Sequence, residues 1–140
     1  VRIGVVGPFT GPSADFGVPM RNGIQLAVDE INAVGGYLGR PLELVIKDDR
    51  ADPDQGRKVS QELLAEKVVA TIGFCNTGVA LKAIDLFQDA QSPLIVPCST
   101  GTAVAFAPFP DTVCLLSSCR CGGRRQRGQS RSRSTSLCRA

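Results

Sequence analysis

The chain has 140 residues, of which 43% are hydrophobic, with six cysteines and no histidine. This length allows one domain with a buried core. No apolar run approaches the roughly 20 residues that span a bilayer. The absence of histidine excludes catalysis by histidine and metal sites with histidine ligands. The net charge of +3 averages two unlike regions, because residues 1–102 carry nine basic and twelve acidic side chains whereas residues 103–140 carry seven arginines and one aspartate. A basic patch in the first region is therefore not expected.

The first predicted element is a strand at Arg2–Gly7, which is continuously apolar after its first residue, as in a buried parallel sheet. An amphipathic helix follows and ends at the double glycine Gly35-Gly36, which supplies the positive φ of a helix end. One face of this helix carries apolar residues at spacings of four, four and three: Met20, Ile24, Val28 and Ile31.

A second strand is predicted at Leu42–Lys47, followed by a helix with Asp52 as its N-cap and Pro53 at its first position. Val59, Leu63 and Leu64 form the core face of that helix. The aspartates around its start lack the glycine and glutamate of an EF-hand, so we interpret them as a solvated loop and a helix cap rather than a metal site.

The third strand is predicted at Val68–Gly73, the third helix at Thr77–Asp89 and the fourth strand at Ser92–Pro97. The third helix should face the core with Leu81, Ile84 and Phe87. The order β-α-β-α-β-α-β predicts an α/β fold, a parallel open sheet with helices on both faces, because such crossovers are right-handed.

Ligands of open α/β sheets bind beyond the carboxyl ends of the strands, where three loops of this chain should lie: Gly7–Gly17, Phe74–Gly78 and Cys98–Thr102. Backbone N–H groups at a helix start attract a carboxylate, and neighbouring hydroxyls add donors. A carboxylate-binding cleft is one interpretation. The other is that Thr77, Ser99 and Thr100 are ordinary caps and loop residues.

Four motifs in residues 1–102 resemble, in the same order, the periplasmic branched-chain amino acid (Leu/Ile/Val-type) binding proteins of ABC importers. They are GP-x-[ST]-GP after the first strand, RNG-x-x-LA-x-x-EIN-x-x-GG, DD-x-x-DP and IVP-x-[SA]-TG. The resemblance implies the first part of one lobe of a type I periplasmic binding fold. It implies a solute receptor rather than an enzyme, without cofactor or metal, located in the periplasm and working with a membrane permease.

The same resemblance implies which residues contact the ligand. Thr77 matches a hydroxyl that meets the ligand carboxylate, Cys98 and Ser99 offer backbone groups, and Thr100 offers both its backbone and its hydroxyl. Phe16 falls where the family often places an aromatic side chain that lines the cleft.

The cysteines depart from the family pattern. Some members join by a disulfide the two positions that are Ala51 and Asn76 here, so that bridge is absent. Cys75 has no evident partner and is predicted to be a buried thiol. Cys98 replaces a usually small residue of the ligand loop and is expected to pack as a small side chain, although a narrowed pocket or a reactive thiol are alternatives.

Residues 103–140 differ in kind from the first region, since arginine, serine, cysteine and glycine replace the continuation that family members show. We interpret this tail as sequence translated out of frame, without a well-packed fold. The alternatives are a disordered natural tail, an arginine- and serine-rich segment that binds nucleic acid, and a metal module, whose cysteine spacing fits poorly. No nucleic-acid partner is expected.

Two further functions remain open at this level. One is a ligand-sensing domain of a receptor or regulator with the same fold. The other is an enzyme of flavodoxin-like topology, which is disfavoured because the chain has neither a G-x-G-x-x-G motif nor a P-loop lysine motif. No basic-then-apolar leader precedes the first strand, which is the expectation for a mature exported domain.

Overall fold

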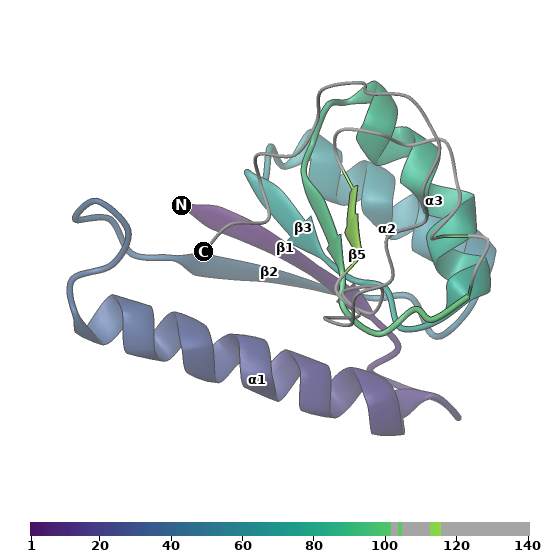
Figure 1. Cartoon of the computed structure of the whole chain (residues 1–140), viewed down its shortest axis with the longest axis horizontal. Helices are drawn as coiled ribbons and strands as arrows, with labels where there is room; N and C mark the ends of the chain where they lie inside the picture. Colours follow the sequence, from purple (N-terminus) through teal and green to yellow (C-terminus); the bar gives the residue numbers. More distant parts are fainter. Residues whose placement is uncertain (102–103, 105–112, 116–140) are drawn as a thin grey trace, which may run out of the picture.

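The computed structural model describes residues 1–101, 104 and 113–115, and shows a parallel sheet of strand order β2-β1-β3-β4-β5 (Figure 1). The strands are β1 (Arg2–Gly7), β2 (Glu43–Asp48), β3 (Ala70–Ile72), β4 (Leu94–Val96) and β5 (Val113–Leu115). The helices are α1 (Ala14–Ala33), α2 (Pro53–Ala65) and α3 (Thr77–Asp89).

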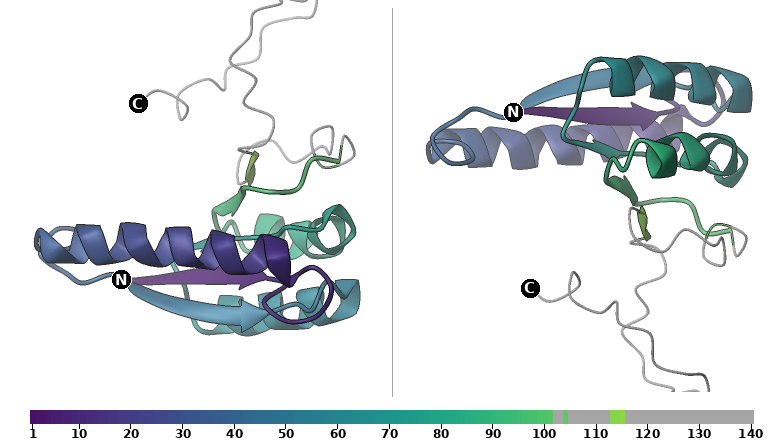
Figure 2. Two further views of the ribbon diagram at one scale, coloured as in Figure 1. Left: turned by 90° about the horizontal axis from the view of Figure 1, so that it is seen from below. Right: turned by 90° about the horizontal axis from the view of Figure 1, so that it is seen from above.

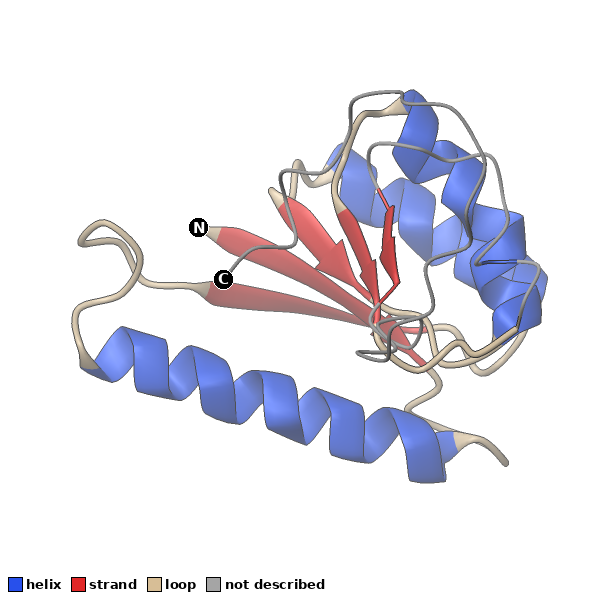
Figure 3. Ribbon diagram, in the orientation of Figure 1, coloured by secondary structure: helices blue, strands red, loops and turns tan. Residues whose placement is uncertain are grey.

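The predicted parallel sheet with helices on both faces is confirmed. Helix α1 lies on one side of the sheet, and α2 and α3 lie on the other (Figures 2 and 3). This division follows from right-handed crossovers, because β1 to β2 steps one way along the sheet whereas β2 to β3 and β3 to β4 step the other way. Strand β1 and helix α3 have the predicted bounds.

The main core lies between the sheet and the pair α2 and α3. Its largest fully buried side chains are Phe74, Phe87, Leu63, Ile84 and Leu94. The rings of Phe74 and Phe87 meet edge to face with centroids 6.3 Å apart. Asp52 caps α2 as predicted, accepting a hydrogen bond from the Asp54 N–H at 2.9 Å.

The prediction that Leu81 faces the core is wrong, since it is 40% exposed. The buried face of α3 runs through Val79, Ala80, Ala83, Ile84 and Phe87. Leu81 is one residue, about 100° around the helix, beyond Ala80 and so falls at the edge of that face.

The face of α1 is buried less than its spacing predicts. Val28 is buried, Met20 and Ile24 are partly buried, and Ile31 is 40% exposed. The helix also begins at Ala14, so Phe16 stands in its first turn and not in the predicted loop. The double glycine behaves as predicted, with φ of 106° at Gly35 and 74° at Gly36.

Strand β5 was not predicted. It pairs in parallel with β4, with Val113 opposite Leu94, inside the region for which the sequence predicted no well-packed fold. In the same region, Val104 lies buried in the core beside residues of α3 and β4. The other residues of the region lie outside the described ones, and for them the absence of a well-packed fold stays a prediction. Among the described residues, no helix has the length and apolar character needed to cross a membrane.

Two glycines test how tightly each side of the sheet is packed. A Cβ at Gly56 of α2 would overlap the Val79 side chain of α3, whereas a Cβ at Gly23 of α1 would meet nothing within 4 Å. Gly56→Ala should therefore lower the free energy of unfolding by about 1–2 kcal/mol, because overpacking outweighs the gain in helix propensity. Gly23→Ala should raise it by about 0.5–1 kcal/mol.

Urea denaturation followed by circular dichroism measures both variants. Equal effects of the two substitutions would contradict this description of the packing.

Candidate functional site

The carboxyl ends of the strands meet at one edge of the sheet because all of them run parallel. Strands β1, β3 and β4 end there at Gly7, Ile72 and Val96. The connection from β1 leads to β2 on one side of β1, and the next connection leads to β3 on the other side. The point at which the strand order reverses, the topological switch point, therefore lies between β1 and β3. Ligands of open α/β sheets bind in the crevice at such a point.

The loops after β3 and β4 join at this edge. Ser99, only 2% exposed, donates a hydrogen bond from Oγ to Thr77 Oγ1 at 3.0 Å. A Cβ at Gly101 would overlap the Thr77 side chain, so glycine lets the β4 loop approach. Thr100, between them, is exposed. The structure thus brings Thr77 and Ser99 together, as expected for convergent loops, and adds Gly101, whose role sequence reasoning missed.

The amino-terminal end of α3 opens onto the same place. Its N-cap residue, Asn76, makes no side-chain capping hydrogen bond, and Asn76 Oδ1 is buried without a hydrogen-bond partner. The first N–H groups of α3 therefore donate no hydrogen bond to a capping side chain, and they lie at the positive end of the helix dipole. Such a helix start, beside two hydroxyls, is suited to an anion.

Asp48, at the end of β2, holds the loop after β1. It accepts hydrogen bonds from the Phe9 N–H at 3.0 Å and from Thr10 Oγ1 at 2.6 Å, and a third from the Arg50 N–H at 2.9 Å. Burial alone would raise the pKa of Asp48, but these hydrogen bonds outweigh it and lower the pKa. The Thr10 hydroxyl is therefore engaged in positioning its own loop.

Phe16 stands apart from the hydroxyl pair. Its side chain is 68% exposed in the first turn of α1, and no ring contact or hydrogen bond described for residues 1–101 joins it to Thr77 or Ser99. The next residue, Gly17, packs directly on the backbone of Pro8, because a Cβ there would overlap the Pro8 carbonyl. Phe16 is thereby fixed near the end of β1.

Asp49 is a fully buried carboxyl group between this edge and α2. Its Oδ1 accepts the Ala51 N–H at 2.9 Å, while its Oδ2 is buried without a partner. Burial raises the pKa of Asp49 to about 6; the Ala51 N–H opposes that rise and the neighbouring Asp48 adds to it.

Cys75 forms no disulfide, as expected, but it is partly buried rather than fully buried. Its thiol lies 3.8 Å from Met20 Sδ, and the Cys98 side chain interacts with it electrostatically. Both cysteines are free and half-buried. Burial raises the pKa of Cys75 to about 12, and Cys98 and Asp49 contribute to the same effect. The parallel pairing of β3 with β4 brings together the loops that carry Cys75 and Cys98, and this topology could have indicated that the two cysteines are neighbours.

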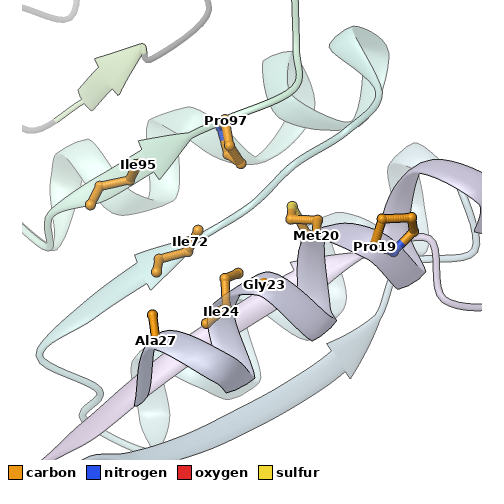
Figure 4. A pocket seen from close by; sticks show the side chains of 8 residues that line it. All are labelled: Pro19, Met20, Gly23, Ile24, Ala27, Ile72, Ile95 and Pro97. Carbon is orange, nitrogen blue, oxygen red and sulfur yellow. The ribbon is translucent and has the colours of Figure 1, made fainter. Parts of the chain in front are cut away.

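A second feature lies on the α1 side of the sheet, where an apolar hollow of about 400 Å³ opens between α1 and strands β3 and β4 (Figure 4). Its lining residues are Pro19, Met20, Gly23, Ile24, Ala27, Ile72, Ile95 and Pro97. None of these side chains could orient a carboxylate, so the hydroxyl pair remains the candidate site. Within the described part of the chain, no group of three or more His, Cys, Asp or Glu side chains could hold a metal ion.

Comparison with known proteins agrees with this geometry. A family model described as periplasmic binding protein matches residues 1–118, beyond the predicted end of the resemblance near residue 102. A Leu/Ile/Val-binding protein homolog of Brucella abortus is 37% identical over 101 residues, covering 72% of this chain and 27% of the relative. The Leu/Ile/Val-binding protein BraC3 of Rhizobium johnstonii is 34% identical over 101 residues, covering 72% and 28%.

Among solved structures, the chain resembles the branched-chain amino acid transporter substrate binding protein LivJ of Streptococcus pneumoniae in complex with isoleucine. The TM-score is 0.77 at 32% identity, and the match covers 83% of this chain and 33% of that one. The chain thus spans just over a quarter of the length of the curated relatives it matches. Their names are those of binding proteins, which agrees with the prediction that the chain is not an enzyme.

The buried carboxyl group of Asp49 predicts a pH-dependent stability. Its pKa is raised to about 6 in the folded chain, so the folded state holds the proton between pH 4 and 6 and the unfolded state does not. The free energy of unfolding should therefore fall between about pH 4 and pH 6 and level off above 6, by about 2–3 kcal/mol from this group. Asp49→Asn should remove this loss. The variant should therefore gain stability relative to the unsubstituted chain as the pH is raised from 4 to 7.

Urea titrations of both chains across that pH range test the effect, with exposed Asp29→Asn as the control. Parallel stability curves for the Asp49→Asn and unsubstituted chains would show that Asp49 does not titrate in this way.

Proposed function

The chain belongs to the periplasmic binding protein family, and from that premise we propose that it supplies one side of a binding site for a branched-chain amino acid or a similar small carboxylate. The whole protein would act outside the cytoplasm as the binding component of an ABC importer. The observation that carries the proposal is the cluster of Thr77, Ser99 and Gly101 at the start of α3.

The cluster has the donors that a carboxylate needs. Thr77 Oγ1 accepts the Ser99 proton, which leaves the Thr77 O–H to donate to a ligand. The first N–H groups of α3 and the backbone groups of Cys98 and Ser99 add donors, and exposed Thr100 adds a hydroxyl. Phe16 would line the cleft from α1. Each hydrogen bond to a charged ligand group contributes about 1.5–3 kcal/mol.

The class of ligand rests on the relatives. One relative is named a Leu/Ile/Val-binding protein and the other a homolog of such a protein, and the similar structure holds isoleucine. These amino acids share the carboxylate and an apolar side chain. The apolar part would have to be recognised elsewhere, because the cluster around Thr77 offers polar groups.

We propose that the 140-residue chain alone binds its ligand weakly. The relatives are much longer, and in a two-lobed protein the second lobe closes over the ligand and supplies further contacts. If a full site bound at about 1 μM, near −8 kcal/mol, half of that energy would leave a dissociation constant of roughly a millimolar. The closed form would be what the permease recognises, so the chain alone would not function in transport.

We extend two further expectations from the sequence as proposals. Residues beyond the match to the family model, which ends at 118, would contribute nothing to the binding site, and no nucleic-acid partner is proposed for them. A ligand-sensing receptor domain of the same fold would use the same half-site. Binding of the whole protein to a membrane permease would distinguish the importer from the sensor.

Nuclear magnetic resonance of the ¹⁵N-labelled chain tests the site. Leucine added at millimolar concentration should shift the amide signals of residues 77–78 and 99–101. Thr77→Val should weaken binding by about tenfold or more, because it removes a hydroxyl donor to a charged group. Thr10→Val is the matched control and should leave binding unchanged, because the Thr10 hydroxyl is engaged by Asp48.

Shifts that spread along α1 instead, or equal binding by the Thr77→Val and unsubstituted chains, would contradict the proposed site. A micromolar dissociation constant for the 140-residue chain would contradict the proposal that it holds only half of the contacts.

A further inference from the structure

Cys75 and Cys98 lie in the two loops that follow the paired strands β3 and β4. These strands pair in parallel with Ile72 opposite Ile95, and each cysteine follows its strand residue by three positions, at 75 and 98. Neighbouring strands lie about 4.8 Å apart, within the Cα separation of about 4.4–6.8 Å that a disulfide bridges. The two loops therefore start at that separation, and each carries its cysteine the same number of residues beyond the paired isoleucines.

Contacts on either side hold the two loops together. After the cysteines, Ser99 Oγ donates to Thr77 Oγ1 at 3.0 Å and Gly101 packs against the Thr77 side chain. Before them, the Gly73 N–H donates to the Ile95 carbonyl oxygen at 3.0 Å. Each cysteine thus lies, along its loop, between two positions at which the loops already contact each other.

The two thiols interact electrostatically. The Cys98 side chain is near enough to raise the pKa of the Cys75 thiol, and Met20 Sδ lies 3.8 Å from that thiol. Met20 and Pro97, the neighbour of Cys98, both line one end of the apolar hollow (Figure 4). Both cysteines are half-buried rather than enclosed, so a small oxidant can reach them.

We propose that Cys75 and Cys98 are a disulfide-forming pair, which under oxidising conditions cross-links the loop before α3 to the loop after β4. This bridge would differ from the one that some family members carry, which joins the positions of Ala51 and Asn76 here. It would fix the spacing of Thr77 and Ser99 by a covalent bond. The cross-link itself does not depend on the proposed function, because it is measured without any ligand.

The oxidant is a low-molecular-weight disulfide such as oxidised glutathione. One cysteine thiolate attacks a sulfur of the oxidant, forms a mixed disulfide and releases one glutathione thiolate. The second cysteine thiolate attacks the protein sulfur of that mixed disulfide and releases the second glutathione. The two protein thiols lose two electrons and two protons, and one glutathione disulfide becomes two glutathione thiols. The raised pKa of Cys75 means that the reaction should accelerate with increasing pH.

The test uses the full chain with the other four cysteines replaced by serine: Cys114, Cys119, Cys121 and Cys138. The folded chain is equilibrated with reduced and oxidised glutathione, alkylated, cleaved with trypsin and analysed by mass spectrometry. Cleavage after Lys67, Lys82 and Arg120 puts Cys75 in peptide 68–82 and Cys98 in peptide 83–120. The expected product is these two peptides joined, two hydrogens lighter than their sum. Cys98→Ala in the same background is the control and should give none.

The same equilibrium in concentrated urea separates a built pair from chance pairing. The folded chain should form the bridge at least about tenfold more favourably than the unfolded chain, because the fold raises the effective concentration of one thiol at the other. Circular dichroism checks that the serine chain is folded before oxidation. Alkylation of both thiols in the folded chain, separate glutathione adducts, or a bridge no more favourable than in urea would overturn the proposal.

Discussion

Parallel pairing of β3 between β1 and β4 is the constraint on which the candidate site depends. Because every described strand runs in the same direction, three loops separated by dozens of residues along the chain end at one edge. The register then decides which side chains meet there. It brings Thr77 to Ser99, and it places Cys75 beside Cys98. An antiparallel strand at β3 would send one of these loops to the opposite edge of the sheet.

The two faces of the sheet contribute differently to this arrangement. Helices α2 and α3 pack closely, with a glycine at their contact and two phenylalanine rings in the core behind the β3 loop. Helix α1 covers the other face incompletely and leaves an apolar hollow beside β3 and β4. Large apolar side chains of α1 and the turn after it are exposed, among them Leu26, Val34 and Leu38. The well-packed face therefore sets the position of α3, and with it the amino-terminal end that we propose to bind an anion.

Much of this fold could be predicted from the sequence, because local signals and long-range packing agree there. The apolar run of β1, the Asp52 and Pro53 start of α2 and the Thr77 start of α3 each have a local physical cause. Leu81 was placed wrongly because helical spacing defines a face but not its centre. Strand β5 was missed because three residues in a region rich in arginine and serine give no periodic signal.

The site was predictable in part. Parallel topology was enough to expect Thr77 and Ser99 at one edge, since that follows from strand order alone. Other features depend on side-chain packing and strand register, which spacing along one chain does not reveal. They are the hydrogen bonds from the loop after β1 to Asp48, the fit of Gly101 against Thr77 and the proximity of the two cysteines. The ligand-binding roles of Phe16, Cys98 and Thr100 remain predictions from the family resemblance.

The central claim is that the start of α3 and the β4 loop bind a carboxylate. A crystal structure of the chain with leucine at high concentration tests it most directly. The account predicts the leucine carboxylate within hydrogen-bond distance of Thr77 Oγ1 and the first N–H groups of α3. Leucine bound only in the apolar hollow under α1, or absent from the edge of a crystal whose Thr77 is open to solvent, would contradict it.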